Sequence, residues 1–263
     1  MKNSLLKTKL DLHYKAFDKS RISPDPLQFL HLFKDEMDIE IAGFISSVFA
    51  YGNVKQIINT LNSIFGILGS HPYDFIKNLD KELLPGFFGR TVHRFYTSRD
   101  IQLFFLELNS VLNKEGSLKN LFLRFYSEHK ADKNLKIPLS GFSNYFLSGF
   151  AGKYKKITPG FRFMFADPLR GSACKRLNLF LRWMIRKDDL DFGIWNEIPA
   201  DKLVIPVDTH VARICRELKL TKRKNVSWKM AEEITENLKK FDPADPVKYD
   251  FAICHIGMRK MIF

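Results

Sequence analysis

The sequence lacks the features that mark several large classes of protein. Its 263 residues include only three cysteines, Cys174, Cys215 and Cys254, which are too few and too scattered for a disulfide framework or a four-thiolate metal site. No apolar run approaches the roughly 20 residues that a membrane-spanning helix needs. Residues 1–9 are polar and contain no apolar segment typical of a signal peptide. We therefore expect a cytoplasmic protein with reduced thiols and no membrane partner.

The chain also contains fewer acidic than basic residues. The chain has 42 lysines and arginines against 29 aspartates and glutamates, which gives a formal net charge of +13. Such an excess favours a polyanionic partner, although a charged surface that only keeps the protein in solution would explain it as well. Hydrophobic residues make up 45% of the chain, including 25 phenylalanines. This content is ample for the core of one large domain or of two closely packed halves.

Apolar residues recur with helical spacing through most of the chain. The pattern predicts helices over residues 35–51, 54–68, 101–112, 118–126, 139–150, 174–186, 207–219 and 227–240, and a last helix that begins at 245–246 and continues past 253. Capping signals support three of the helix starts: Thr97 with Asp100, Ser227, and Asp245 before Pro246.

Strand signals are almost absent, and only residues 203–207 could form one short strand. Loops are expected around residues 86–89 and 131–138. The predicted fold class is all-α, with about ten helices in two lobes that together form a single unit over residues 1–263.

One of the predicted helices follows a turn of small residues and carries Lys175. The turn contains Gly171, Ser172 and Ala173, whose small side chains allow backbone N–H groups to approach a phosphate at the positive end of the helix. A lysine on a helix is most simply a solvated charge. Here it would lie on the first turn beside Arg176, and neighbouring cations favour the neutral, nucleophilic form of an amine.

A second candidate, Asp208, follows a short β-branched run that contains Pro206. Its simplest role is to cap the helix that begins at residue 209. The apolar residues 203–207 would also remove the carboxylate partly from water. There it could stabilise a developing oxocarbenium ion at C1′ of a sugar, or take a proton from an attacking nucleophile. Both roles remain open at this point.

Basic residues continue beyond Asp208. His210 and Arg213 come first, followed by Arg216, Lys219, Lys222, Arg223 and Lys224. Such a run can be a solvated face, but its start beside Asp208 makes it a candidate for phosphate contacts. The histidines and cysteines lack the recurrent spacing of a zinc site, and no histidine is identified that would activate a thiol nucleophile. We therefore expect no metal and no cofactor.

These motifs resemble the signature of the helix-hairpin-helix superfamily of DNA glycosylases, which includes endonuclease III and the 8-oxoguanine glycosylases. In that signature a glycine hairpin leads into a helix with a catalytic lysine, and an apolar-Val-Asp-x-His segment carries a catalytic aspartate. The matching residues are Gly171 for the first hairpin glycine, Lys175, Asn178, Asp208 and His210. Residues 225–256 resemble the closing helices of the superfamily, and the whole chain resembles a conserved bacterial family within it.

The sequence departs from the pattern at three places. Ala173 replaces the second hairpin glycine. Asp208 follows Lys175 by 33 residues, which is longer than in endonuclease III, because of an insertion at residues 187–199 that is similar to the archaeal 8-oxoguanine glycosylases. The four-cysteine loop of endonuclease III is missing, so no iron–sulfur cluster is expected.

The resemblance implies a two-lobed helix-hairpin-helix glycosylase fold in which residues 165–219 form the hairpin, its helix and the catalytic aspartate segment. The protein would act as a monomer on double-stranded DNA in base-excision repair. Lys175 would attack C1′ and form a Schiff base, aided by Asp208, and β-elimination would then nick the strand, which is AP lyase activity. An oxidised purine such as 8-oxoguanine is the expected substrate.

The resemblance also assigns surfaces. Phosphate contacts are expected from Gly171, Ser172, Ala173, Arg176, His210 and Arg213. Residues 49–53 lie at a helix-to-loop junction where the superfamily often places a wedge, whereas Trp183 fits a core position better than a base pocket. Two alternatives stay open: a non-catalytic nucleic-acid-binding protein that retains the glycosylase fold, and a structural or RNA-associated protein that uses the basic face alone.

Overall fold

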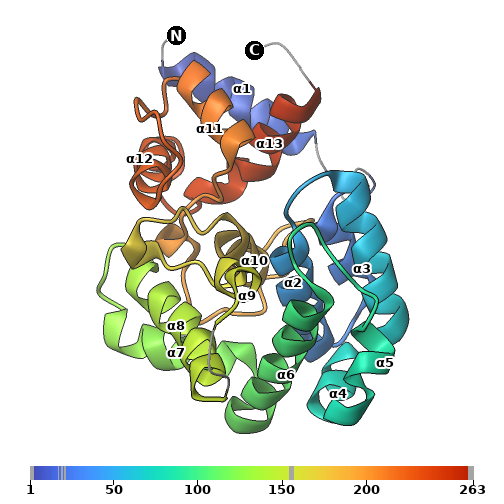
Figure 1. The fold of residues 1–263 in the computed structure, drawn as a ribbon. Helices are drawn as coiled ribbons and strands as arrows, with labels where there is room; N and C mark the ends of the chain where they lie inside the picture. Colours follow the sequence, from blue (N-terminus) through green and yellow to red (C-terminus); the bar gives the residue numbers. More distant parts are fainter. Residues whose placement is uncertain (1–2, 17, 19, 21, 154–156, 260–263) are drawn as a thin grey trace. The chain divides into compact units, whose positions relative to one another are not determined.

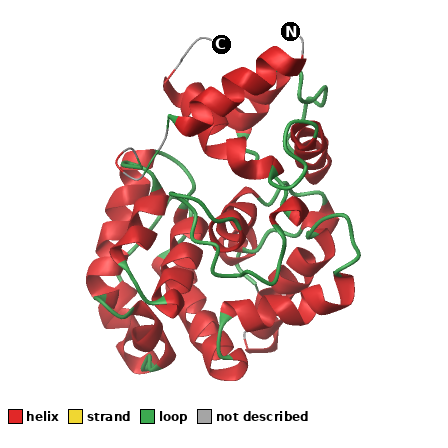
Figure 2. Ribbon diagram, turned by 180° about the vertical axis from the view of Figure 1, so that it is seen from behind, coloured by secondary structure: helices red, strands yellow, loops and turns green. Residues whose placement is uncertain are grey.

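The computed structural model describes residues 3–16, 18, 20, 22–153 and 157–259, which form helices joined by irregular segments (Figures 1 and 2). Within these residues there are two isolated β-bridges, His93 with Tyr96 and Lys187 with Phe192, and no strand. The all-α class is therefore confirmed. The possible strand at residues 203–207 was wrong, because this segment is irregular and the backbone N–H of Ile205 donates to Oγ1 of Thr235 at 3.0 Å.

The chain divides into two compact units. Unit 1 consists of Met1–Ile22, Asp132–Leu135 and Pro168–Phe263, and unit 2 consists of Ser23–Ala131 and Lys136–Asp167. None of the helices formed by the described residues is long and apolar enough to cross a membrane.

Unit 2 is built around a helix that is buried on nearly all sides. Its elements are η2 (Pro26–Leu32), α2 (Glu36–Phe49), α3 (Val54–Leu68), α4 (Pro72–Lys77), η3 (Lys81–Leu83), α5 (Leu84–Phe88), α6 (Ser98–Glu115), α7 (Leu118–Tyr126), η4 (Ser127–His129), α8 (Lys136–Lys153) and α9 (Pro159–Met164). Helix α2 is the central one, and its Phe44 ring lies 5.7 Å from the ring of Phe104 and 5.5 Å from that of Phe146. The predicted capping box of Thr97 and Asp100 is confirmed at the start of α6.

Both loop predictions needed partial correction, although residues 131–135 are irregular as expected. Residues 84–88 form α5, since Leu84 and Phe88 are buried and the Phe88 ring stacks on that of Phe105 at 4.1 Å. Helix α8 begins at Lys136, inside the segment expected to be a loop, and Pro138 lies in its first turn, where proline disrupts no helical hydrogen bond.

Unit 1 carries the residues that the sequence singled out. Its elements are α1 (Asn3–Lys15), η5 (Pro168–Arg170), α10 (Lys175–Ile185), η6 (Ala200–Lys202), α11 (Thr209–Glu217), α12 (Trp228–Lys239), η7 (Pro246–Tyr249) and α13 (Asp250–Arg259). Helix α13 packs against α1 and α11. Trp183, Trp195 and Trp228 are fully or almost fully buried, so the core position predicted for Trp183 is confirmed.

The start of the last helix differs from the prediction. Asp245 makes no side-chain capping bond, and the residues after it form the 3-10 helix η7 before α13 begins at Asp250. The Asp245 carboxylate is used elsewhere, because its Oδ2 accepts a hydrogen bond of 2.8 Å from Nε of Arg186. By contrast, Ser227 caps α12 as predicted and accepts from the backbone N–H of Met230.

Candidate active site

A tight turn places Lys175 at the first position of α10. Gly171 has a φ of 87° and Cys174 a φ of 48°, so the chain enters the left-handed region twice within four residues. Glycine adopts this region without strain, which explains the residue at the first of these positions. The turn is fixed from two sides: the backbone N–H of Trp228 donates to the Gly171 carbonyl at 3.0 Å, and Nδ2 of Asn178 donates to the Ala173 carbonyl at 3.0 Å.

Asp208 is the N-cap of α11, as the sequence predicted. Its Oδ1 accepts hydrogen bonds from the backbone N–H groups of His210 at 2.9 Å and Val211 at 3.0 Å. Its other oxygen, Oδ2, lies 3.7 Å from Nζ of Lys175. One carboxylate therefore caps a helix with one oxygen and faces the lysine with the other.

The Lys175 and Asp208 side chains are both open to solvent in part, with exposed fractions of 29% and 32%. An ion pair this accessible contributes little to stability, because water screens it and holding the side chains in place costs entropy. Its value is chemical instead. A ligand that covered the pair would remove the water that stabilises the two charges, and this loss of solvation favours proton transfer from the ammonium to the carboxylate, which leaves both groups neutral.

The structure separates the residues expected to contact phosphate into two groups. Gly171, His210 and Arg213 are exposed and Ser172 is half-buried, so these four remain accessible. Ala173 and Arg176 are each only 7% exposed. Arg176 is buried within unit 1, so its phosphate contact stays a prediction against which this burial counts. The carbonyl of Ala173 accepts from Asn178, and the contact expected between its backbone N–H and a phosphate stays a prediction.

The thiol of Cys215 is a poor candidate for a nucleophile. Cys215 of α11 is fully buried, and this burial raises the pKa of its thiol, with Asp250 and Asp208 adding to the effect. A thiol that resists ionisation is a poor nucleophile. Among the residues that the structure describes, no three histidine, cysteine, aspartate or glutamate side chains are grouped so that they could hold a metal ion.

Unit 2 contains an aromatic cluster that only partly matches the expectation for residues 49–53. Phe49 is buried, but the ring of Tyr51 lies 5.4 Å from that of Phe95 and 4.8 Å from that of Phe163. Phe95 and Phe163 are themselves 4.6 Å apart. Phe95 is 45% exposed, and the guanidinium of Arg94 lies 5.4 Å from the Tyr51 ring centre. The sequence did not indicate this cluster, because its rings come from three separate segments.

Sequence reasoning also missed a buried charged network in unit 1. Arg182, in the last turn of α10, and Arg186, the C-cap of that helix, are each 4% exposed and bind carboxylates from later segments of the chain. The only signal in the sequence was two arginines four residues apart within a helix that is otherwise largely apolar.

Comparison with known proteins places the chain in a protein family. Neither a curated protein nor a solved structure matches the chain. Residues 25–259 match a protein family described as "protein of unknown function (DUF2400)", and this range contains both Lys175 and Asp208. The chain belongs to the DUF2400 family.

Proposed function

We propose that the protein is a DNA glycosylase of base-excision repair that uses Lys175 as its nucleophile and also has AP lyase activity. The observation that carries this proposal is the 3.7 Å approach of Nζ of Lys175 to Oδ2 of Asp208 at the starts of α10 and α11. Covalent removal of a base from a sugar needs an amine that can lose its proton, a nearby group to accept the proton, and access for the substrate. This pair supplies all three.

The reaction can be written from these two side chains. Asp208 accepts a proton from the Lys175 ammonium, and the amine lone pair forms a bond to C1′ of the deoxyribose. The bond between C1′ and the base breaks, and its electron pair leaves with the base, which takes up a proton. Opening of the sugar ring then leaves an imine between Nζ and C1′. Loss of a C2′ proton and of the 3′ phosphate breaks the strand, and water releases the lysine.

Binding of DNA would rest on the charge and shape of the same surface. The start of α10, where the N-cap residue Cys174 makes no side-chain capping bond, offers backbone N–H groups at the positive end of a helix dipole, which favours phosphate. His210 and Arg213 lie on the exposed first turns of α11, and the basic residues at 219–224 follow in the loop toward α12. A net charge of +13 strengthens attraction to a polyanion.

The aromatic cluster of unit 2 supports a nucleic-acid partner independently of the catalytic pair. An exposed ring held by other rings, with a guanidinium beside it, is suited to stacking against an unpaired base. Phe95 is that ring, backed by Tyr51 and Phe163. The segments at residues 51–55, 90–99 and 162–163 that build the cluster contain five lysines and arginines and no aspartate or glutamate.

For the substrate we propose an oxidised purine, with 8-oxoguanine as the first choice. The basis is the 33-residue separation of Lys175 and Asp208, which resembles that of the archaeal 8-oxoguanine glycosylases. A second candidate function is nucleic-acid binding without catalysis. It is favoured by the finding that Oδ1 of Asp208 caps α11, since this structural task alone accounts for an aspartate at the position.

The test is borohydride trapping of the wild-type protein on duplexes that contain 8-oxoguanine, an abasic site or no lesion. Borohydride reduces an imine to a stable amine and so fixes the protein to the DNA. We expect adducts with the abasic and 8-oxoguanine duplexes and none with undamaged DNA. Binding of all three duplexes without any adduct would instead support the non-catalytic function.

A further inference from the structure

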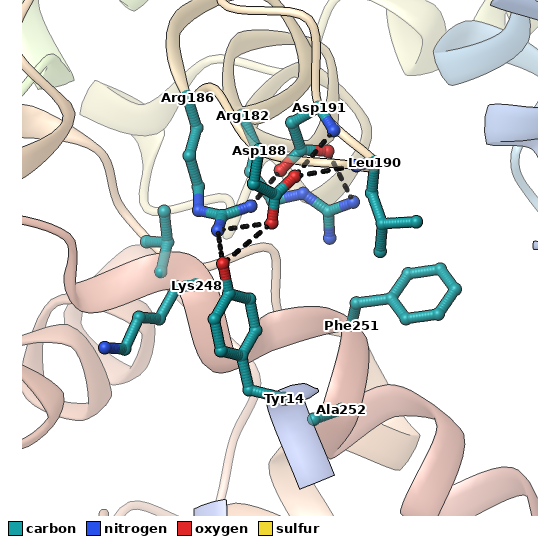
Figure 3. Close-up of a pocket in the computed structure, with 10 residues that line it drawn as sticks. Tyr14, Arg182, Arg186, Asp188, Leu190, Asp191, Lys248, Phe251 and Ala252 are labelled. Atoms are coloured by element: carbon teal, nitrogen blue, oxygen red, sulfur yellow. Dashed lines mark hydrogen bonds and ion pairs between the residues drawn. The ribbon is translucent and has the colours of Figure 1, made fainter. Parts of the chain in front are cut away.

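Helix α10 carries Lys175 at its first position, and ion pairs fix its other end (Figure 3). Four carboxylates bind Arg182 and Arg186 there: Asp188, Asp191, Asp245 and Asp250. Asp191 bridges the two guanidinium groups, at 3.1 Å from Arg182 and 2.6 Å from Arg186. Since Arg182 comes about two helical turns after Lys175, the place of the lysine also depends on how the chain enters the helix.

The peptide unit between Ala173 and Cys174, just before Lys175, is held at both ends. Its carbonyl accepts a hydrogen bond of 3.0 Å from Nδ2 of Asn178, and its N–H donates to Oγ of Ser172 at 3.2 Å. The orientation of this peptide unit determines the φ angle of Cys174, which is 48°. A residue other than glycine is strained at such an angle and keeps it only where its surroundings impose it.

Asn178 is placed to impose this angle. It is 2% exposed, and besides the bond from Nδ2 its backbone N–H donates to the Cys174 carbonyl at 2.9 Å. The carbonyl groups on both sides of the Cys174 α-carbon therefore accept from one residue. Cys174 is the N-cap of α10 and makes no side-chain capping bond, so its own side chain does not provide the cap.

We propose that Asn178 is a positioning residue for Lys175: it keeps Cys174 left-handed and thereby places Nζ of Lys175 3.7 Å from Oδ2 of Asp208. The catalytic part of this inference rests on the proposed function. If Cys174 moved to the right-handed region, the first turn of α10 would have to shift or unwind, because the far end of the helix is fixed. Lys175 is the first residue of that turn. The alternative is a buried asparagine that only stabilises the fold.

The backbone geometry can be tested without any activity. A left-handed residue has a short distance between its own amide and α protons, which gives a strong nuclear Overhauser effect between them. We expect a strong signal for Cys174 in the wild type and a weak one in Asn178→Ala. An equally strong signal in Asn178→Ala would overturn the inference, since Cys174 would then keep its geometry without Asn178.

Borohydride trapping on an abasic duplex tests the catalytic consequence. Asn178→Ala should trap about 100-fold more slowly at unchanged DNA affinity, because a displacement of about 1 Å at a reacting group costs about this much. The matched control is Asn109→Ala on α6, which removes bonds from Nδ2 of an asparagine to the carbonyls of Ile76 at 2.8 Å and Lys77 at 3.0 Å. It should trap at the wild-type rate. Equal rates for the two variants would contradict the positioning role.

Two double variants separate position from stability. Adding Cys174→Gly to Asn178→Ala should restore most of the trapping rate, because glycine adopts a φ of 48° without strain. Adding Cys174→Ala removes the same thiol but keeps the strain, so the rate should stay low. Equal rates for the two double variants would overturn the inference. If Asn178→Ala alone does not fold, folding restored by Cys174→Gly and not by Cys174→Ala supports the inference, and failure of both to fold contradicts it.

Failure of the proposed function would look different. A wild type that never traps, combined with loss of the left-handed signal of Cys174 in Asn178→Ala, would keep the backbone role of Asn178 and contradict the glycosylase reaction. A wild type that traps, combined with wild-type trapping by Asn178→Ala, would keep the reaction and overturn the inference.

Discussion

Nζ of Lys175 lies 3.7 Å from Oδ2 of Asp208, although the two residues are 33 positions apart in the sequence. Each stands at the start of a helix, Lys175 as the first residue of α10 and Asp208 as the cap of α11. The carboxylate divides its tasks between its two oxygens, because Oδ1 serves the helix and Oδ2 faces the amine. A substitution that keeps the helix cap but removes the carboxylate that faces the amine distinguishes the structural role of Asp208 from its chemical role.

Asp208→Asn is that substitution. Asparagine caps a helix about as well as aspartate, and the lost ion pair is partly exposed, so the free energy of unfolding should change by less than about 1 kcal/mol. Base release should be abolished or greatly slowed, because an amide cannot accept the lysine proton, while DNA binding stays intact. Urea unfolding and single-turnover base release measure the two effects. Base release at the wild-type rate would reduce Asp208 to a helix cap.

Arg213→Ala tests the phosphate-binding surface. Arg213 is exposed and pairs with Glu217 at 2.8 Å, an exposed pair of small energetic value. If Arg213 contacts a phosphate, its loss should weaken binding to all duplexes alike and reduce the slope of log affinity against log salt by about one.

The matched control is Arg124→Ala. Arg124 lies on α7 and is 49% exposed, close to the 48% of Arg213, and it also pairs with a glutamate, Glu115 at 3.0 Å. Its loss should leave the salt slope unchanged. If both substitutions lower the slope equally, the attraction is a property of the whole charged surface and not of α11.

Phe95→Ala tests the aromatic cluster of unit 2. Since the ring is 45% exposed, its removal should cost little stability, yet affinity for a single-stranded oligonucleotide should fall by about 1–3 kcal/mol, the worth of one stacked base. Val92→Ala in the same loop, where the side chain is 63% exposed, is the control and should bind normally. Fluorescence anisotropy with a labelled oligonucleotide measures both. Unchanged binding by Phe95→Ala would show that the Phe95 ring does not stack on a base.

Asp188→Asn should show a stability loss that depends on pH. Burial raises the pKa of Asp188, but the charge of Arg186 and hydrogen bonds from it and from the backbone of Asp191 and Leu190 lower it below its usual value overall. The carboxylate therefore stabilises the fold above the unfolded pKa of about 4, and this contribution is lost as the pH falls through the lower folded value. The difference from wild type in urea unfolding, about 1–3 kcal/mol at pH 7, should shrink below about pH 4. A difference that stays constant down to pH 3 would contradict this role.

Features encoded by neighbouring residues could be predicted from the sequence. Helix α3 begins and ends at the predicted residues, and the Thr97, Asp208 and Ser227 caps form as expected, since each depends on a side chain and a backbone group within a few positions. Both members of the Lys175–Asp208 pair were found in the same way, from the local context of each. The 3.7 Å distance between them could not be predicted, because it depends on how α10 and α11 pack.

Features that depend on contacts between distant segments of the chain could not be predicted from the sequence. Arg182 and Arg186 are buried because aspartates between residues 188 and 250 reach them, and helical periodicity says nothing about such pairing. The burial of Arg176 could not be predicted for the same reason, because it depends on how distant segments pack around this side chain. The loop predicted at residues 86–89 rested on its two glycines, whereas burial of Leu84 and Phe88 decided for a helix.

The measurement that tests the account most directly is borohydride trapping of Lys175→Arg beside the wild type and Lys175→Gln on an 8-oxoguanine duplex and on an abasic duplex. Only a neutral amine can form the imine, and arginine keeps the charge without supplying that amine. We predict that the wild type forms a covalent adduct, that Lys175→Arg binds the duplex without forming one, and that Lys175→Gln forms none and nicks no strand. An adduct with Lys175→Arg as abundant as with the wild type, or a wild-type adduct that maps to a different lysine, would contradict the assignment of Lys175 as the nucleophile.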